Sequence, residues 1–401
     1  MHAVRAPVAF DGSRFVPDGA TVLIDGDRIA GVEAFGCDLP DGCEVTAYDG
    51  TLLPGLFDMH THLVSDGSLG ALDRLGPATD EELDATAEAS LATQARAGVT
   101  TVRDLGDRRY RTLVARDREL PGAPRIVAAG PPLTVPDGHC HMMGGAVAGP
   151  SEIRAAVAEH RDRGVDVVKV MASGGMLTAG TDVLGVQFPD TELRLLVDCV
   201  HEAGLSVVAH AHSLASIELA LAAGVDGIEH FTGLTEGGIR VPDDLLDRAA
   251  AAGVAVDPTL GLDRTVLATL PAPPPSVVEA LRRAGLDVDT LQTARRTVVG
   301  RMRAHGVRVV TGVDSGAAPV KPHGSIALAL AELVEAGYPM AEALATATSA
   351  AAHACGLADV TGALRAGLAA DLLVVDGDLR DGPAPLSRPV SVVIRGVEVE
   401  G

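Results

Sequence analysis

The sequence predicts an α/β fold, a (β/α)8 TIM barrel with a small β-sandwich domain built from both termini. The first observation behind this is a junction that occurs six times, in which a helical run ends at a glycine and a short Val/Ile-rich strand follows. The second is a total of eight such strands, the number at which a parallel sheet closes on itself. The third is a change of pattern at both ends, where short strands and turns replace the junctions.

Both ends of the chain read as short strands separated by turns. The N-terminal segments are FDGSRF (10–15), VLIDGDRIAGV (22–32) and VTAYDGTLL (45–53), and the C-terminal ones are DLLVVDGD (371–378) and SVVIRGVEVEG (391–401). Neither end has enough strands for an independently stable sheet. We therefore expect residues 1–53 and 360–401 to form one composite β-sandwich domain, with the barrel at residues 54–359 inserted between them. Two separate β decorations are the alternative.

The barrel is expected to begin with GLFDMH (55–60) and to include RIVAAG (125–130) between the first two junctions. The strands after the junction glycines are too apolar for a half-solvated edge, which indicates parallel strands covered on both faces. Each of these glycines suits the left-handed conformation that ends a helix, and they are Gly98, Gly164, Gly204, Gly224, Gly253 and Gly306. An insertion at residues 259–300 lies between the seventh and eighth strands, and its role stays open.

Charge and composition exclude several classes of partner. The chain has 54 acidic and 32 basic residues, and its net charge of −22 repels nucleic acid and anionic membrane surfaces. Its five cysteines are scattered and odd in number, which predicts neither a disulfide framework nor a structural zinc site. No uncharged apolar stretch reaches the length of about 18 residues that a membrane span needs. We expect a cytoplasmic protein that acts on a small molecule.

The first barrel strand ends in two histidines, His60 and His62. The two-residue period of a strand places both imidazoles on one face, as a shared cation requires. In a parallel barrel this end of the strand lies at the mouth where active sites form. For this motif alone, two exposed turn histidines are the alternative.

Lys169 lies inside the apolar fourth strand, residues 167–171. A buried ammonium group is costly, so the side chain must reach solvent, pair with an acid, lose its proton or be converted to an anion. Carbamylation by CO₂ would convert it to a bidentate carboxylate able to bridge two metal ions. A lysine paired with an acid at the barrel mouth is the alternative.

Further metal-ligand residue types end the fifth, sixth and eighth strands. His210 and His212 end the fifth strand, His230 ends the sixth, and Asp314 follows the eighth. Taken singly, each is more typical of a loop, a packing position or a turn. With the two histidines of the first strand and the buried lysine, they gather at one end of five strands and predict a metal centre, although not all need bind metal.

This arrangement of HxH, lysine, two histidines and aspartate resembles the amidohydrolase superfamily. The flanking segments also resemble that family's β-sandwich, so the resemblance covers nearly the whole chain. Five motifs are similar to the imidazolonepropionase-related branch, which includes metal-dependent Xaa-Pro and Xaa-Arg dipeptidases. These motifs are TTVRDLG (100–106), GHCHMMGG (138–145), KVMASGG (169–175), AHAHS (209–213) and GVDGIEH (224–230).

The resemblance implies two divalent metal ions, with zinc expected. His60, His62 and Asp314 would hold the more buried ion. His210 and His230 would hold the more exposed one, while carbamylated Lys169 would bridge the two ions together with a hydroxide. Asp314 would then be the general base that passes a proton to the leaving nitrogen.

The resemblance also suggests residues that bind substrate. His139 would contact the substrate carbonyl or carboxylate, with an exposed loop histidine as the alternative. His212 stands where related dipeptidases often have a tyrosine that recognises the carboxylate, and it would either bind that group or cap the helix beginning near Leu214.

Two other pairs of charged or titratable residues are interpreted as structural or solvated. Arg103 and Asp104 at the end of the second strand are expected to form an ion pair beneath the mouth. Lys321 and His323, in the loop after the eighth strand, are expected to be solvated, with contact to an anionic substrate group as the alternative.

The expected function is a binuclear metal-dependent amidohydrolase that cleaves an amide bond in a dipeptide or N-acyl amino acid. A hydrolase of phosphotriesters, carbamates, ureas or lactones is the alternative, because the same metal centre serves both. A mononuclear deaminase or imidazolone hydrolase is disfavoured because no acid follows the strand-five histidine closely. A non-enzymatic scaffold is disfavoured because all six ligand positions are filled. Homo-oligomers are common in similar proteins.

Overall fold

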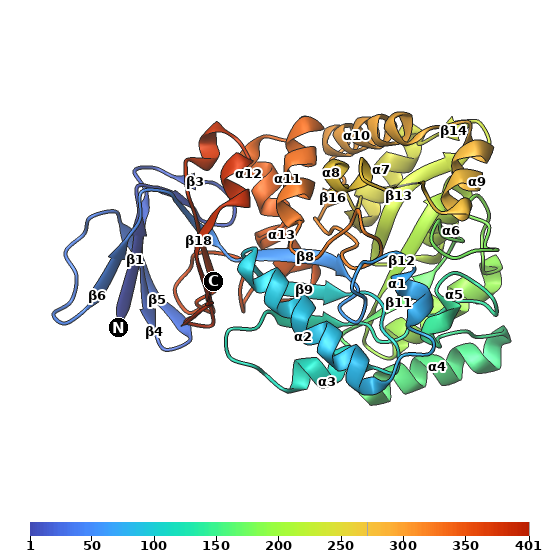
Figure 1. Cartoon of the computed structure of the whole chain (residues 1–401), viewed down its shortest axis with the longest axis horizontal. Coiled ribbons are helices and arrows are strands. Elements are labelled where there is room, and N and C mark those ends of the chain that lie inside the picture. Colours follow the sequence, from blue (N-terminus) through green and yellow to red (C-terminus); the bar gives the residue numbers. More distant parts are fainter. Residues whose placement is uncertain (271, 401) are drawn as a thin grey trace.

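A computed structural model describes residues 1–270 and 272–400, and it shows a mixed α/β fold with two parallel sheets in the central part of the chain (Figure 1). One sheet has the order β10-β9-β8, and the other has the order β11-β12-β13-β15-β16, with β14 paired to β13. Their strands are β8 (Leu56–Thr61), β9 (Val99–Asp104), β10 (Arg125–Ala128), β11 (Val167–Met171), β12 (Ser206–Ser213), β13 (Gly227–Thr235), β14 (Gly238–Ile239), β15 (Ala255–Asp257) and β16 (Arg308–Val309).

Backbone contacts link the two sheets at both of their edges. Next to β10, Leu133 forms a parallel bridge with Val170 of β11, and its N–H donates to the Lys169 carbonyl over 2.8 Å. At the other edge, the Met59 N–H of β8 donates to the Thr311 carbonyl, which follows β16, over 3.1 Å. The carboxyl ends of the first and last strands are therefore neighbours.

Helices alternate with these strands. The six junction glycines all have positive φ, between 65° and 85°, as the prediction of left-handed helix ends requires. Helix α2 begins with a capping box between Thr79 and Glu82. The helices are α1 (Ala71–Arg74), α2 (Asp80–Arg96), α3 (Arg111–Asp117), α4 (Gly149–Arg163), α5 (Asp190–Glu202), α6 (Leu214–Ala223), α7 (Asp243–Ala252), α8 (Arg264–Leu267), α9 (Pro275–Ala284), α10 (Val288–Ala304), α11 (Ile326–Glu335), α12 (Met340–Thr346) and α13 (Ser349–Ala354), with 3-10 turns η1 (His141–Met143), η2 (Leu379–Asp381) and η3 (Ala384–Ser387).

Strands from both ends of the chain share one sheet, at the left of Figure 1. Its order is β19-β18-β17-β7-β2-β3, and a second sheet beside it has the order β5-β4-β1-β6. Val4, Leu52 and Leu372 belong to one buried cluster between them. The strands are β1 (His2–Ala6), β2 (Val8–Phe10), β3 (Phe15–Val16), β4 (Ala20–Asp25), β5 (Arg28–Ala34), β6 (Glu44–Ala47), β7 (Thr51–Pro54), β17 (Leu372–Val375), β18 (Pro389–Ile394) and β19 (Val397–Glu398).

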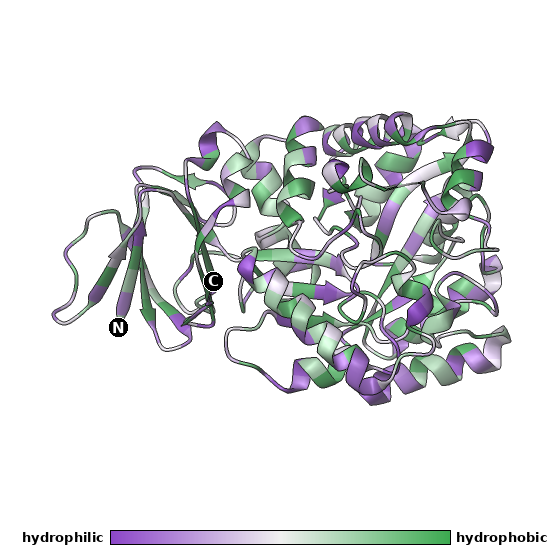
Figure 2. Cartoon of the chain, in the orientation of Figure 1, coloured by the Kyte–Doolittle hydropathy of each residue, from purple (hydrophilic) through white to green (hydrophobic). Residues whose placement is uncertain are grey.

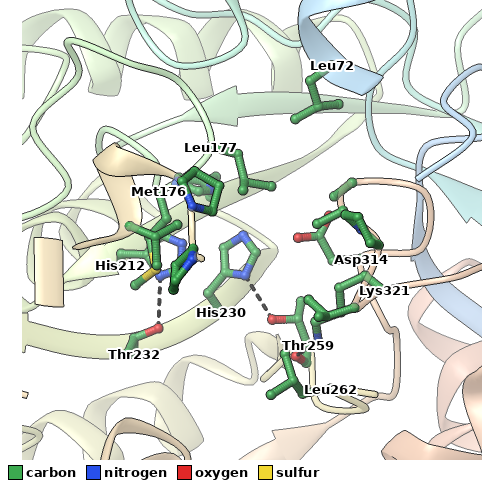
Figure 3. A pocket seen from close by; sticks show the side chains of 18 of the residues that line it. Leu72, Met176, Leu177, His212, His230, Thr232, Thr259, Leu262, Asp314 and Lys321 are labelled. Carbon is green, nitrogen blue, oxygen red and sulfur yellow. Dashed lines mark hydrogen bonds between the residues drawn. The ribbon is translucent and has the colours of Figure 1, made fainter. Parts of the chain in front are cut away.

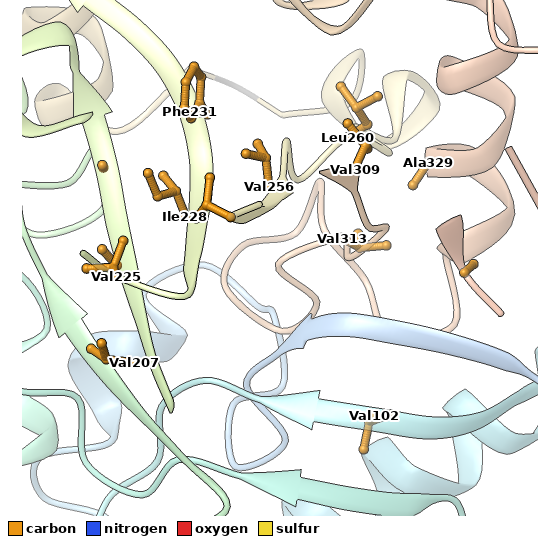
Figure 4. Packing of buried hydrophobic residues seen from close by; sticks show 14 of the residues in the cluster. Val102, Val207, Val225, Ile228, Phe231, Val256, Leu260, Val309, Val313 and Ala329 are labelled. Carbon is orange, nitrogen blue, oxygen red and sulfur yellow. The ribbon is translucent and has the colours of Figure 1, made fainter. Parts of the chain in front are cut away.

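The main core lies on the parallel strands. Every residue of β8, β9 and β11 is buried, as their apolar sequences predict. Figure 4 shows one buried residue from each of four neighbouring strands, Val207, Ile228, Val256 and Val309. The surrounding helices alternate between hydrophobic and hydrophilic stretches (Figure 2).

All five cysteines are free thiols, as the absence of a disulfide pattern in the sequence predicts. Within the described ranges, no helix combines the length and apolar character needed to cross a membrane.

Candidate metal centre

A cavity of about 210 Å³ opens at the carboxyl ends of the parallel strands (Figure 3). The predicted ligands line it, and each comes from a strand end or from the loop after it. They are His60 in β8, His62 directly after β8, Lys169 in β11, His210 in β12, His230 in β13 and Asp314 after β16. His139 and His212, the predicted substrate contacts, line the same cavity.

The two histidines of β8 converge on one carboxylate. His60 Nε2 lies 3.4 Å and His62 Nε2 lies 3.2 Å from Asp314 Oδ1. All three side chains come from the place where β8 lies beside the segment that follows β16. Two imidazole nitrogens facing one carboxylate oxygen form a donor set suited to a divalent cation.

A second set of imidazoles lies beside the first. His210 and His230 have ring centroids 4.6 Å apart, and His212 stacks on His230 at 4.3 Å. Ligand atoms of these three histidines all lie within 4.8 Å of one another, and so do those of His60, His230 and Asp314. His230 therefore belongs to both groups, and the structure adds His212 to the candidate donors.

Unusual backbone conformations bring two of these side chains into the cavity. His230 has φ 70° and Asp314 has φ 71°, a region that residues with a Cβ rarely adopt. Such conformations persist only where the surrounding structure holds them, and they cluster at functional sites. Thr259, which contacts His230, has φ 47°.

Burial keeps the second set of imidazoles neutral. It lowers the pKa values of His210 and His230 well below the ordinary 6.5, and neighbouring histidines lower them further. Only a neutral imidazole has a lone pair for a metal ion. For Asp314, attraction to His60 and His62 outweighs the effect of burial and lowers the pKa of the carboxyl below its usual range. His210, His230 and Asp314 are therefore in the protonation states that a cation needs, whereas Asp314 and Asp104 raise the pKa of His62 against the effect of its burial.

Lys169 is buried without a partner. Its side chain is 1% exposed, and within the described part of the chain Nζ has no hydrogen-bond partner. Burial lowers its pKa to about 8, against the attraction of Glu229 and Asp314. Among the residues that the structure describes, no acid forms an ion pair with this lysine, contrary to the alternative weighed from the sequence. An unpartnered buried amine among metal-ligand residues fits a position that a cation or a covalent modification completes.

Glu229 and Arg103 form a buried network that the sequence did not predict. Arg103 Nη2 donates to Glu229 Oε1 over 2.8 Å, while Glu229 Oε2 lies 2.7 Å from His60 Nδ1 without hydrogen-bond alignment. The predicted ion pair between Arg103 and Asp104 is wrong, because adjacent strand residues point to opposite faces. Asp104 instead accepts from the Leu63 N–H over 2.6 Å. The available signal for this network was the acid directly before the histidine in β13.

Three histidine rings each contact a threonine through Nδ1. His230 lies 2.8 Å from Thr259 Oγ1, as Figure 3 shows, and His212 lies 2.9 Å from Thr232 Oγ1. The third pair joins His139 to Thr178 over 2.7 Å. Such contacts fix the ring orientation and direct Nε2 toward a ligand in His230 and His212, while Nε2 of His139 lies 3.5 Å from Cys140 Sγ.

The structure also places the predicted substrate residues. His139 is 6% exposed, and its ring centroid lies 4.5 Å from that of His210, so it is no exposed loop histidine. His212 does not cap α6, because the Ser213 hydroxyl accepts from the Ser216 N–H at that helix start.

The prediction that Lys321 is solvated is wrong, and His323 is only partly exposed. Lys321 is 8% exposed, and Nζ donates to the Thr259 carbonyl over 2.8 Å and to the Leu260 carbonyl over 3.0 Å. His323 Nε2 lies 2.9 Å from the Ser65 carbonyl oxygen. Both side chains are thus held by backbone carbonyl oxygens of neighbouring segments.

The insertion at residues 259–300 contains α8, α9 and α10, and it forms a wall of the cavity. Its contribution is largely apolar, from Leu262, Leu267, Leu270, Val277, Leu281 and Leu291. The site thus combines a polar base, where metal-ligand residues converge, with an apolar wall, which is the usual construction of a small-molecule site.

Comparisons with known proteins agree with this site. The model of the amidohydrolase family matches residues 51–399. An uncharacterised protein of Mycobacterium tuberculosis is 30% identical over 393 residues, which are 95% of this chain and 93% of that protein. Ochratoxinase of Aspergillus niger is 27% identical over 357 residues, 81% of this chain and 70% of that enzyme. A solved Xaa-Pro dipeptidase structure with methionine bound in the active site has a TM-score of 0.85 at 25% identity, covering 100% of both chains.

Proposed function

The chain belongs to the amidohydrolase family and is a metal-dependent hydrolase of carbon–nitrogen bonds, and on this premise we propose that it cleaves an amide bond in a dipeptide or an N-acyl amino acid. The observation that carries the proposal is the convergence of His60 and His62 on Asp314, with the unpartnered Lys169 lining the same cavity. The cavity volume of about 210 Å³ supports a small substrate, since ligand pockets commonly span about 300–1,000 Å³.

The proposed centre holds two divalent cations, with Zn²⁺ as the proposed metal. His60, His62 and Asp314 would hold one cation, and His210 and His230 the other, with Lys169 between them as a carbamate. When bound, such a pair lowers the pKa of a water and polarises the carbonyl of the scissile amide. His212 lies close enough to His210 and His230 to compete as a donor.

Asp314 is the proposed general base. His60 and His62 hold its pKa low, so the carboxyl is ionised, and its position beside both histidines would let it accept a proton from the attacking water. The same carboxyl would then return the proton to the leaving nitrogen, which an amide needs before its amine can depart. His139, held by Thr178, would orient the substrate carbonyl or carboxylate from the side of His210.

The finer features of the fold are also proposals. We infer that the two linked parallel sheets form one closed (β/α)8 barrel at residues 54–359, supported by backbone bonds at both edges. Residues 1–53 and 360–401 would form the composite β-sandwich domain. A cytoplasmic location and a homo-oligomer are kept as predictions from the sequence and its resemblance.

Metal analysis and a substrate panel test this function together. Elemental analysis is expected to give two metal equivalents per chain, and one or none would contradict the binuclear centre. The panel compares dipeptides and N-acyl amino acids with esters, phosphotriesters, carbamates, ureas and lactones. Faster turnover of any compound from the second group than of every amide would replace the proposed substrate class.

A further inference from the structure

Two cationic side chains face the cavity beside the metal centre, Arg295 of α10 and Lys321 of the loop after β16. We propose that Arg295 and Lys321 form a carboxylate-binding subsite, so that the enzyme selects amides carrying a free carboxylate next to an apolar group. This inference rests on the proposed function and names the substrate class of the same site.

Both cations are anchored to the same short segment. Lys321 Nζ donates to the Thr259 carbonyl over 2.8 Å, and Arg295 Nη2 donates to the same oxygen over 3.0 Å. The two charged atoms therefore lie no farther apart than the sum of these distances. Arg295 Nη2 also donates to the Pro258 carbonyl and, over 3.1 Å, to Thr259 Oγ1. Carbonyl oxygens solvate both cations in part but carry no compensating charge.

Among the described residues, no acid forms a direct ion pair with Arg295 or Lys321. Asp257, Asp314 and Glu332 attract both cations through space, but in the described part of the chain none of the three forms an ion pair with Arg295 or Lys321. The Asp314 oxygen faces the two histidines of β8, and Glu332 Oε1 accepts from the Leu262 N–H over 3.2 Å. Two like charges held close together in a buried place are costly, so an arriving anion would relieve both desolvation and repulsion.

The position of the pair links it to the reacting centre. Thr259 contacts both cations and also His230, whose Nδ1 lies 2.8 Å from Thr259 Oγ1. Figure 3 shows Lys321 between Thr259 and Asp314. A substrate whose amide lies at the metal centre would therefore place a group only a few bonds away against Arg295 and Lys321, as the α-carboxylate of an amino acid is placed.

The remaining wall determines what accompanies the carboxylate. Leu267, Val277, Leu281 and Leu291 come from the insertion that also supplies Arg295. Apolar side chains are favoured against such a wall at about 25 cal/mol per Å² of buried area. The preferred substrate is therefore an N-acylated or N-terminally extended amino acid with an aliphatic side chain.

Arg295 has a competing structural role, because it donates to the threonine that contacts His230. If Arg295 acts only through Thr259, its replacement changes metal content and affects charged and neutral substrates alike. Lys321 does not contact Thr259 Oγ1, so its replacement separates the two roles. A carboxylate contact predicts a loss confined to substrates that carry the charge.

The test measures acetate release by the zinc-loaded enzyme, and calorimetric binding, for three probes. N-acetyl-leucine carries an α-carboxylate, N-acetyl-leucinamide carries none, and N-acetylglutamic acid α-amide carries only a side-chain carboxylate. The enzyme is expected to prefer at least one carboxylate probe over the leucinamide by about 10- to 100-fold, the range for a hydrogen bond to a charged group. Which carboxylate probe is preferred distinguishes an α-carboxylate from a side-chain carboxylate.

Three variants decide the assignment. Arg295→Met and Lys321→Met are each expected to reduce this preference to below about threefold while metal content stays at the wild-type value. Arg301→Met, on the same helix and paired with Asp243 at the surface, is the matched control and should keep it. Equal binding of all probes by the wild type, or an undiminished preference in Lys321→Met, would overturn the subsite. If no probe is hydrolysed, the proposed amidase function fails, and the binding data still decide the subsite.

Discussion

Replacing Thr259 with valine is expected to weaken metal binding without unfolding the protein. Thr259 Oγ1 lies 2.8 Å from Nδ1 of His230, a buried ring. When Nε2 of an imidazole holds a cation, Nδ1 keeps its proton and needs an acceptor. Valine has nearly the shape of threonine but offers no acceptor. The metal-bound form of the variant would therefore bury an unpaired N–H group.

The size of the loss follows from that single N–H group. Leaving a buried donor unsatisfied costs about 1–3 kcal/mol, which weakens binding by about 5- to 150-fold. In the metal-free protein the neutral ring can carry its proton on Nε2 instead, so the thermal unfolding temperature should change little. Arg295 keeps its hydrogen bonds to the carbonyl oxygens of Pro258 and Thr259 in the variant.

Competition with a chromogenic chelator measures the zinc affinity, and Thr232→Val is the matched control. Thr232 Oγ1 makes the equivalent contact with His212, at 2.9 Å, but His212 is not one of the proposed ligands. The zinc affinity of the control should stay within about twofold of the wild-type value, a change well below 1.4 kcal/mol, which corresponds to a tenfold difference in affinity. An equal loss in both variants would make His212 a ligand. An unchanged affinity in Thr259→Val would refute the proposed role of His230.

Three further predictions address the centre. Lys169→Ala should lose bound metal, as measured by elemental analysis, and retain less than about one-hundredth of the activity. This loss exceeds the 10- to 100-fold that is typical when a residue that only hydrogen-bonds to a metal ligand is replaced. Full metal content with full activity would refute the bridging role. Glu229→Gln should leave Arg103, 4% exposed, as an uncompensated buried charge and lower the free energy of unfolding in urea by about 3–5 kcal/mol, whereas a change below 1 kcal/mol would contradict the network. Stoichiometric metal removal by a chelator should abolish amide hydrolysis, Zn²⁺ should restore it, and activity that survives complete removal would argue against metal-dependent chemistry.

Local chemistry made much of the fold predictable. Each junction glycine has a positive φ, and an apolar strand follows each one. The match to the amidohydrolase family confirms the resemblance carried by the motifs. The exact first and last residues of the strands could not be predicted as well. β16 spans only Arg308–Val309, although the Val310 N–H still donates to the Val256 carbonyl of β15 and the Thr311 carbonyl accepts from Met59 of β8.

Side chains at strand ends could be placed from the sequence, but their partners could not. His60, His62 and Asp314 meet because parallel strands present their carboxyl ends at one edge, a rule that needs no coordinates. Thr259 and Arg295 have no motif of their own, and their contacts depend on how the insertion packs. The same holds for Lys321, which is buried and held by backbone carbonyl oxygens of a neighbouring segment.

The pairing of β7 with β17 has a consequence for biosynthesis. The Thr51 hydroxyl donates to the Gly377 carbonyl over 2.7 Å across a sequence separation of 326 residues. On the ribosome, β7 therefore emerges long before its hydrogen-bonding partner exists, and its exposed edge has to wait through the translation of all the parallel strands. Nascent chains in this interval present an open template for intermolecular association, and completion of that sheet is among the last events of maturation.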